Sequence, residues 1–309
     1  MRALVVTNLY PSAQDPVRGR FVRDQVEALR RLPELELELY TFSSLGPSGY
    51  LGAIRGARRR FRGTRFDVVH AHFGLNIWPS LAVRADVHGV TLHGTDLAHP
   101  RSRAITAAGL PFLDLVAPVS EPLRDRLPRR WVRGRVEVLP TGVDLRRFRR
   151  IERPEARRAL GLKENGRYLL FPADPARPEK RYDRAREVAD EVPLLVLGSV
   201  DPNQVPLWVN AADAVLVTSE RESFGLAVLE ALACDVPALA TPVGVAPQVL
   251  PGVEGAYCGE FDATAWRSAL ERILAEPDPR VEGRAAAARY SADRMAERVY
   301  RVWQELLAG

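Results

Sequence analysis

Short apolar runs alternate with helical patterns along the whole chain. Each apolar run ends in a polar loop, and the clearest are residues 3–6, 66–71, 113–119, 168–171 and 214–217. Segments with apolar residues at helical spacing follow most of these loops, for example residues 21–31. Apolar strands alternating with helices are typical of a parallel sheet covered on both faces. The pattern therefore predicts an α/β chain with doubly wound sheets.

Residues 215–242 form the clearest single unit of this pattern. An apolar strand leads into a polar loop that contains Glu222, a helical pattern starts near Gly225, and the next strand covers 238–240. Glu230 shares a helix stripe with small and apolar side chains, where a carboxylate is costly unless it is hydrogen-bonded. Hydroxyl groups of a ligand would satisfy it, whereas the alternative is a glutamate on the solvated face. The helix start supplies free N–H groups that suit a phosphate.

These residues carry a resemblance to a known family. The segment from Glu222 to Glu230, ESFGLAVLE, resembles the E-x7-E signature of family 4 glycosyltransferases, which are retaining enzymes with the GT-B fold. The resemblance implies that Glu230 holds the nucleotide ribose and that Glu222 lies against the donor sugar. It also implies that Phe224, Gly225 and Leu226 contribute amides to the sugar and phosphate.

Further segments extend the resemblance to the donor diphosphate and the nucleotide base. Pro178-Glu179-Lys180 is similar to a family segment whose lysine pairs with the diphosphate, which implies that role for Lys180. The family arginine five residues earlier is replaced here by Pro175, so Arg177 is the weaker candidate. Ser199 and Val200, after the strand near 194–198, would lie at the nucleotide base.

The first half contains the landmarks DVVHAHF (67–73) and VTLHGTD (90–96). His93 in the second landmark matches the family histidine that faces the donor sugar and its phosphate. Gly19 would bring a loop after the first strand close to the donor phosphates, although a simple helix-entry glycine explains it equally well. No D-x-D and no carboxylate–histidine cluster indicates a metal, so we expect no metal and no cofactor beyond the donor.

The length of 309 residues suits two domains. With the resemblance, it predicts a GT-B arrangement of two Rossmann-like doubly wound domains that face a cleft. We place the N-terminal, acceptor-side domain at 1–148 and the C-terminal, nucleotide-sugar domain at 149–290. The resemblance further implies that a C-terminal helix, 291–309, crosses back and packs on the first domain.

Charge is divided unevenly between the halves. Residues 1–150 contain 25 arginines and 14 carboxylates, whereas residues 151–309 contain 19 basic and 25 acidic residues. The basic half, with the arginine-rich segment 50–65 that reads as an amphipathic helix, raises the hypothesis of peripheral contact with an anionic membrane. A plain solvated surface helix is the alternative. No nucleic-acid motif stands out, and without a signal peptide or an apolar span we expect a cytoplasmic protein, peripheral at most to the inner membrane face.

The resulting functional prediction is a metal-independent, retaining glycosyltransferase of the hexosyltransferase type. Its donor would be a nucleotide-sugar, with UDP- and GDP-sugars favoured, and its acceptor a glycan, a lipid-linked molecule or a small molecule. Three positions depart from the family pattern, namely Asp235, Val245 and Gln248. They leave open a non-catalytic nucleotide-sugar or glycan-binding protein with a decayed site, and a GT-B epimerase or phosphorylase is a second alternative.

Overall fold

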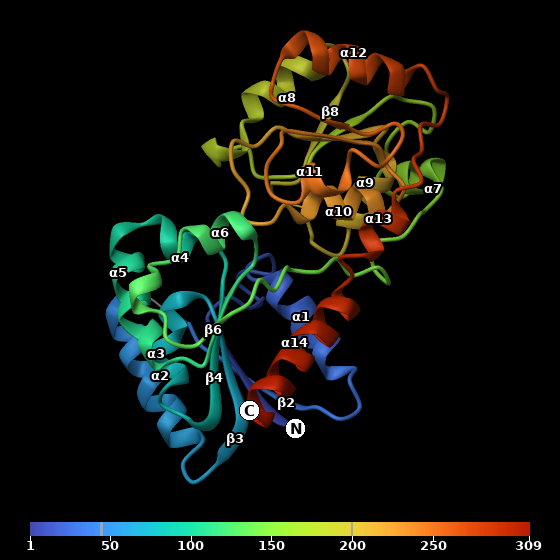
Figure 1. Cartoon of the computed structure of the whole chain (residues 1–309). Helices are drawn as coiled ribbons and strands as arrows, with labels where there is room; N and C mark the ends of the chain where they lie inside the picture. The colour runs from blue at the N-terminus through green and yellow to red at the C-terminus, as the bar shows by residue number, and fades with distance from the viewer. Residues whose placement is uncertain (44–45, 199) are drawn as a thin grey trace. The chain divides into compact units, whose positions relative to one another are not determined.

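The computed structural model describes residues 1–43, 46–198 and 200–309 (Figure 1). The chain divides into two compact units, which we describe separately. Unit 1 contains residues 1–142 together with 292–309, and unit 2 contains residues 143–291. Each unit is a parallel sheet with helices on both faces, so the α/β, doubly wound prediction is confirmed.

Unit 1 is built on a six-stranded parallel sheet with the order β2-β1-β3-β4-β5-β6. The strands are β1 (Arg2–Thr7), β2 (Glu36–Thr41), β3 (Arg65–His72), β4 (Arg84–Leu92), β5 (Leu115–Pro118) and β6 (Arg135–Val136). β2 is an edge strand, which agrees with its alternation of apolar and acidic residues. The central strands are apolar on both faces because neighbouring side chains enter different cores, as Val68 and Val69 do.

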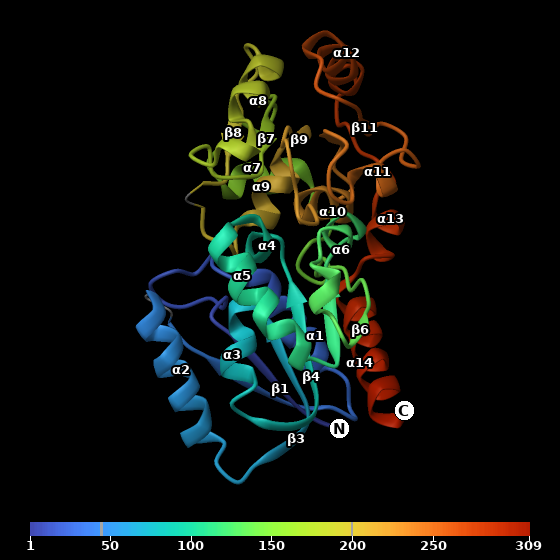
Figure 2. The same ribbon diagram turned by 60° about the vertical axis from the view of Figure 1, so that its left-hand side comes forward.

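Helices cover both faces of the unit 1 sheet, as Figure 2 shows. The helices are α1 (Arg20–Arg30), α2 (Gly46–Arg60), α3 (Ile77–Ser80), α4 (Thr95–Ala98), α5 (Pro100–Gly109), α6 (Glu121–Asp125) and α14 (Ala292–Ala308). α1 and α14 pack on one face, where Leu29, Val299 and Trp303 share a core. α2 packs on the other face through Ala57, and Phe61 directly after it joins the same core.

Unit 2 is built on a five-stranded parallel sheet with the order β11-β10-β9-β7-β8. Its strands are β7 (Leu169–Phe171), β8 (Leu194–Val196), β9 (Ala214–Val217), β10 (Ala238–Ala240) and β11 (Tyr257–Cys258). Its helices are α7 (Arg153–Ala159), α8 (Tyr182–Ala189), α9 (Val205–Ala211), α10 (Leu226–Ala233), α11 (Ala246–Val249), α12 (Ala263–Leu274) and α13 (Arg284–Ala288). One face packs on α8 and α12, with Trp266 fully buried against Leu216 and Leu239.

The chain passes between the units at two places. Residues 143–148, which we had placed in the first domain, belong to unit 2. The physical reason is that Arg284 donates to the carbonyls of Leu145 and Phe148, and Val143 pairs with Ser291. The last helical pattern is interrupted between α13 and α14, and α14 belongs to unit 1, where it packs on α1.

The arginine-rich segment 50–65 is helical only as far as Arg60, where α2 ends, and Arg65 begins β3. Its apolar residues do not all face solvent. Phe61 is buried and packs edge-on against Phe66. Leu51, by contrast, is 56% exposed. Burial of Phe61 therefore removes a large apolar group from the surface that would contact a membrane. None of the helices in the described part of the chain combines the length and apolarity that a bilayer crossing requires.

Candidate functional site

The first part of the candidate site is the loop between β9 and α10 in unit 2. Gly225 begins the helix with a φ of +91°, a conformation that glycine adopts without strain. The next loop supports this turn, because the amide of Val245 donates to the carbonyl of Phe224 over 2.7 Å. Gly244 allows this approach, since a Cβ there would lie 2.4 Å from that carbonyl oxygen. The loop is therefore held at the carboxyl edge of the sheet, where doubly wound folds bind ligands.

Lys180 and Glu222 form an ion pair at this edge. Lys180 Nζ lies 2.6 Å from Glu222 Oε1, and the two side chains are only 14% and 12% exposed. Ser219 Oγ donates to the same oxygen over 2.8 Å. Thr218 ties the two loops together, because its hydroxyl donates to the carbonyls of Lys180 and Arg181. The structure thus brings together two predicted residues that are 42 positions apart, and their role in binding a donor remains a prediction.

Arg177 is placed differently from Lys180. Its guanidinium donates twice to Glu179, and its side chain is 55% exposed. The amide of Lys180 donates to the carbonyl of Arg177 over 3.0 Å, but no ion pair or side-chain hydrogen bond joins the Arg177 guanidinium to Glu222 or Lys180 among the described residues. Arg177 would have to leave Glu179 before it could reach a diphosphate bound at Lys180.

Glu230 projects from α10 and is about one-fifth exposed, which lies between the buried and the fully solvated alternatives. Arg147 Nη2 lies 3.9 Å from Glu230 Oε1. The Arg147 guanidinium also stacks over the ring of Phe148, with 4.4 Å to its centroid. Sequence reasoning missed Arg147, because it belongs to an arginine-rich stretch that reads as a linker.

The segment predicted to meet the nucleotide base lies beside another loop of the same edge. A Cβ on Gly198 would lie 3.2 Å from Pro175, so the chain after β8 closely approaches the loop after β7. Val200 is partly buried there. Ser199 lies outside the described residues.

Each departure from the family pattern has a structural account. Asp235 has a φ of +56°, which aspartate tolerates better than most residues, and its carboxylate accepts from the amide of Arg284. Val245 is buried behind the Phe224 loop. Gln248 accepts a hydrogen bond from the hydroxyl of Tyr290. These contacts explain how the fold accommodates the three residues.

In unit 1, Gly19 lies directly before α1 with a φ of +65°. A Cβ at this position would lie 2.1 Å from the backbone carbon of Leu9, in the loop after β1. Both the conformation and the contact require glycine. The structure thus supplies a packing reason for Gly19, whereas its predicted approach to donor phosphates remains untested.

His93 follows β4 at the carboxyl edge of the unit 1 sheet and is 8% exposed. The Phe21 ring lies 4.7 Å from its ring, and its Nε2 lies 3.1 Å from Nδ1 of the buried His72. Burial, together with the neighbouring His70, lowers the pKa of His93 to about 3. His93 is therefore neutral at physiological pH, and its ring donates one hydrogen bond and accepts one but carries no charge. The partner His72 was not predicted as a site residue.

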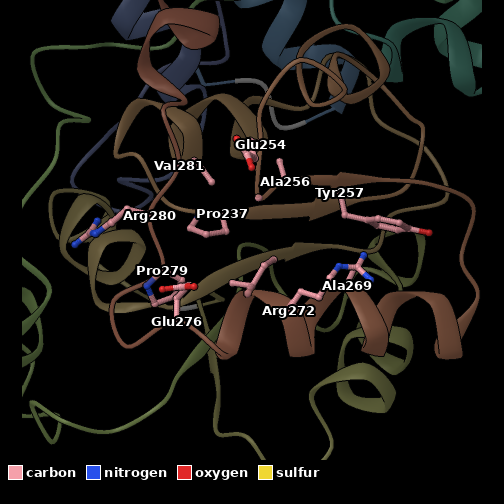
Figure 3. A pocket seen from close by; sticks show the side chains of 12 residues that line it. Pro237, Glu254, Ala256, Tyr257, Ala269, Arg272, Glu276, Pro279, Arg280 and Val281 are labelled. Atoms are coloured by element: carbon pink, nitrogen blue, oxygen red, sulfur yellow. The ribbon is translucent and has the colours of Figure 1, made fainter.

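Unit 2 contains a cavity of about 330 Å³, and none of its predicted site residues within the described part of the chain lines that cavity (Figure 3). Its walls include Pro237 and Ala256, which directly precede β10 and β11. It therefore opens at the amino edge of the sheet, opposite to Glu222 and Lys180. Arg280 in its wall already donates to the carbonyls of Cys234 and Ile151.

Unit 1 contains a larger cavity, of about 540 Å³, at the carboxyl ends of β1 and β2. Amide, hydroxyl, carboxylate and guanidinium groups line it, and they belong to Asn8, Tyr10, Ser12, Gln14, Asp15, Arg18, Thr41 and Ser43. Pro11 and Phe42 add apolar surface to this lining, so the cavity combines hydrogen-bond donors and acceptors with apolar walls. Its chemistry suits a ligand with several hydroxyl groups.

Comparisons with known proteins identify the protein family to which the chain belongs. Residues 7–147 match the family described as Glycosyltransferase Family 4, and residues 176–293 match Glycosyl transferases group 1. A D-inositol 3-phosphate glycosyltransferase of Actinosynnema mirum is 30% identical over 287 residues, covering 73% of this chain and 68% of the relative. A protein of the same name from Pseudarthrobacter chlorophenolicus is 27% identical and covers 76% and 69%.

Solved structures agree over almost the whole length. Sucrose-phosphate synthase from Thermosynechococcus elongatus superposes with a TM-score of 0.74 at 20% identity, covering 99% of both chains. Anabaena HepE in complex with UDP-glucose has a TM-score of 0.73 at 14% identity, covering 99% of this chain and 100% of HepE. The two parallel-sheet units are those of the GT-B glycosyltransferase fold. Within that class, the chain belongs to the family 4, group 1 glycosyltransferases.

Proposed function

We propose that the protein transfers a hexosyl group from a nucleoside-diphosphate sugar to an acceptor hydroxyl, with retention of the anomeric configuration and without a metal. The observation that carries this proposal is the Lys180–Glu222 pair beside the start of α10. A lysine ammonium and free helix N–H groups are suited to the charge that develops on a leaving diphosphate. A UDP- or GDP-sugar fits this description, because both supply a diphosphate and a ribose.

The diphosphate of the donor would replace the Glu222 carboxylate as the partner of the Lys180 ammonium. In the free protein this ammonium already has a carboxylate partner, so a bound diphosphate must exchange one anion for another. The exchange would release Glu222 to accept hydrogen bonds from hydroxyls of the sugar. Glu230 would accept from the ribose hydroxyls, and amides of Phe224, Gly225 and Leu226 would support the sugar and phosphate. His93 would contact the sugar as a neutral imidazole.

The acceptor would bind in the unit 1 cavity at the carboxyl ends of β1 and β2. Its polar lining supports a polyhydroxylated acceptor, and Arg18 is a cationic group in that lining. The names of the relatives are consistent with this chemistry, since inositol 3-phosphate is a small polyol with an anionic group. We therefore favour a phosphorylated polyol, either free or as part of a larger molecule.

Peripheral contact with an anionic membrane would bring a lipid-linked acceptor to unit 1. Five arginines on or directly after α2 are exposed and form no ion pair within the described residues: Arg55, Arg58, Arg59, Arg60 and Arg62. Like charges at such spacing destabilise a helix. An anionic surface would relieve this repulsion, with about 1 kcal/mol from each arginine near it.

The test is release of nucleoside diphosphate from a panel of nucleotide-sugars, with and without polyol phosphates as acceptors. We expect one donor to be consumed, with release stimulated by an acceptor. Lys180→Ala should lower turnover by about two orders of magnitude, as loss of a preorganised charge-stabilising donor does. Tight donor binding without any turnover would support the alternative of a non-catalytic binding protein. Loss of wild-type activity on chelation would contradict the metal-free proposal.

A further inference from the structure

Three buried histidines lie in a row in unit 1. His70 and His72 point to the same side of β3, and His93 follows the neighbouring strand β4. The rings of His70 and His72 are 5.5 Å apart, and those of His72 and His93 are stacked at 5.4 Å with an angle of 19°. Burial lowers the pKa of all three, so each ring is neutral and carries one N–H.

The position of the proton on His70 follows from its partners. The indole of Trp303 can only donate, and its Nε1 lies 3.2 Å from Nδ1 of His70. Nδ1 must therefore accept, which leaves the proton on Nε2. That N–H points to the Thr91 hydroxyl at 2.7 Å. His70 thus uses both nitrogens to connect α14 to the sheet.

The pair of His72 and His93 has two alternative proton arrangements. His72 Nδ1 lies 3.1 Å from His93 Nε2, so one of these two nitrogens donates to the other. If His93 donates, the proton of His72 must lie on its Nε2. That atom is buried and has no hydrogen-bond partner in the described structure. An orphaned buried N–H is rarer and costlier than an unused acceptor.

The second arrangement avoids this cost. If Nδ1–H of His72 donates to Nε2 of His93, only a lone pair remains unused on His72. His93 must then carry its own proton on Nδ1. The backbone around His93 is also fixed, because the buried carboxylate of Asp96 accepts from the amides of His93 and Gly94.

We propose that His72 is a positioning residue that fixes the tautomer of His93, so that His93 presents an Nδ1–H donor to an oxygen of the donor sugar or its phosphate. The inference rests on the proposed function for the identity of that oxygen, but the tautomer itself does not. The His72 hydrogen bond decides which His93 nitrogen carries the proton, as partner bonds do for other histidines. The stacking with His72 and the contact with Phe21 hold the ring orientation.

The first experiment reads the tautomer directly, without an activity assay. Protein labelled with ¹⁵N-histidine is examined by two-dimensional NMR, and the His93 signals are assigned by their loss in His93→Gln. We expect a protonated Nδ1 and a bare Nε2 on His93 at pH 7. The reverse pattern on His93 would overturn the proposal. This outcome is independent of catalysis, so failure of the proposed function would not be mistaken for it.

The second experiment compares two variants of His72. His72→Asn keeps an N–H close to the position of Nδ1, whereas His72→Leu removes the donor. We expect His72→Leu to lower kcat by roughly ten- to a hundredfold, as misplaced groups do, with unchanged affinity for the nucleoside diphosphate, which is proposed to bind unit 2. His72→Asn should restore most of kcat. Equal activity of the two variants would overturn the positioning role, and if His72→Leu does not fold, the NMR result on the wild type decides.

Discussion

Replacing Glu222 by glutamine should make the protein bind free nucleoside diphosphate more tightly while lowering its turnover. In the free protein, Glu222 competes with the diphosphate for Lys180. Glutamine is nearly isosteric, and it can still accept hydrogen bonds from Lys180 and Ser219, but it carries no charge. The diphosphate would then gain the ammonium without displacing an anion. Turnover should fall because a charged acceptor for the sugar hydroxyls is lost.

The magnitude follows from the geometry of the pair. The two charged atoms are 2.6 Å apart, and both side chains are largely buried. Exposed ion pairs contribute about 0.2–1 kcal/mol, whereas hydrogen bonds to charged groups contribute about 1.5–3 kcal/mol. Because the glutamine oxygen would still accept a hydrogen bond from the Lys180 ammonium, we expect a gain near the lower end of the second range, about 1.5 kcal/mol. That corresponds to roughly tenfold tighter binding.

Isothermal titration calorimetry with UDP and with GDP, at fixed ionic strength, measures this effect. Glu220→Gln is the matched control, because Glu220 lies in the same loop but pairs with Arg181 and Arg184. The control should leave nucleotide affinity almost unchanged. Unchanged or weaker affinity in a folded Glu222→Gln protein would refute the reasoning, since it would show that the diphosphate does not take Lys180 from Glu222.

Three other predictions concern separate features of the molecule. Glu230→Ala should weaken nucleoside diphosphate binding by about 1.5–3 kcal/mol for each ribose hydrogen bond lost, and unchanged affinity by calorimetry would remove Glu230 from the site. The three buried histidines should make unit 1 acid-labile. Their folded pKa lies below the unfolded value near 6.5, at about 3 for two of them, so the unfolded state binds protons first and stability falls as pH decreases from 6.5. The expected slope is about 1.4 kcal/mol per pH unit for each histidine, and equal urea midpoints at pH 7 and pH 5 would contradict it. Arg58→Glu with Arg59→Glu should reduce sedimentation with anionic vesicles at low salt, whereas Arg272→Glu in unit 2 should not, and wild-type protein that ignores such vesicles would exclude membrane contact.

The fold could be predicted largely from local patterns. Apolar runs such as 214–217 become central strands because both of their faces are buried, and the acidic alternation of 36–41 marks an edge strand. The predicted domain boundary, after residue 148, differs from the observed one, after residue 142, because a linker and a segment packed on a domain can have the same composition. Residues 143–148 belong to unit 2 because Arg284 donates hydrogen bonds to carbonyls of this segment. No local sequence pattern predicts these hydrogen bonds.

The residues of the candidate site could be predicted from the sequence only where they belong to a recognisable motif. Glu222 and Lys180 stand in recognisable segments, but their mutual ion pair depends on the approach of two distant loops. His72 and Arg147 were missed for the same reason, since their importance lies in a partner rather than in a motif. The helical spacing of apolar residues also could not predict that Phe61 is buried in the core, because a residue directly after a helix can point either to the core or to solvent.

The central claim is glycosyl transfer with retention, and real-time ¹H NMR of a reaction with an α-configured nucleotide-sugar tests it most directly. We predict that the anomeric signal of the donor decays while a new α-glycosidic signal of the acceptor grows at the same rate, and that Lys180→Ala slows both changes by about a hundredfold. A β-configured product, or a donor signal that persists unchanged with every acceptor in the panel, would contradict the account.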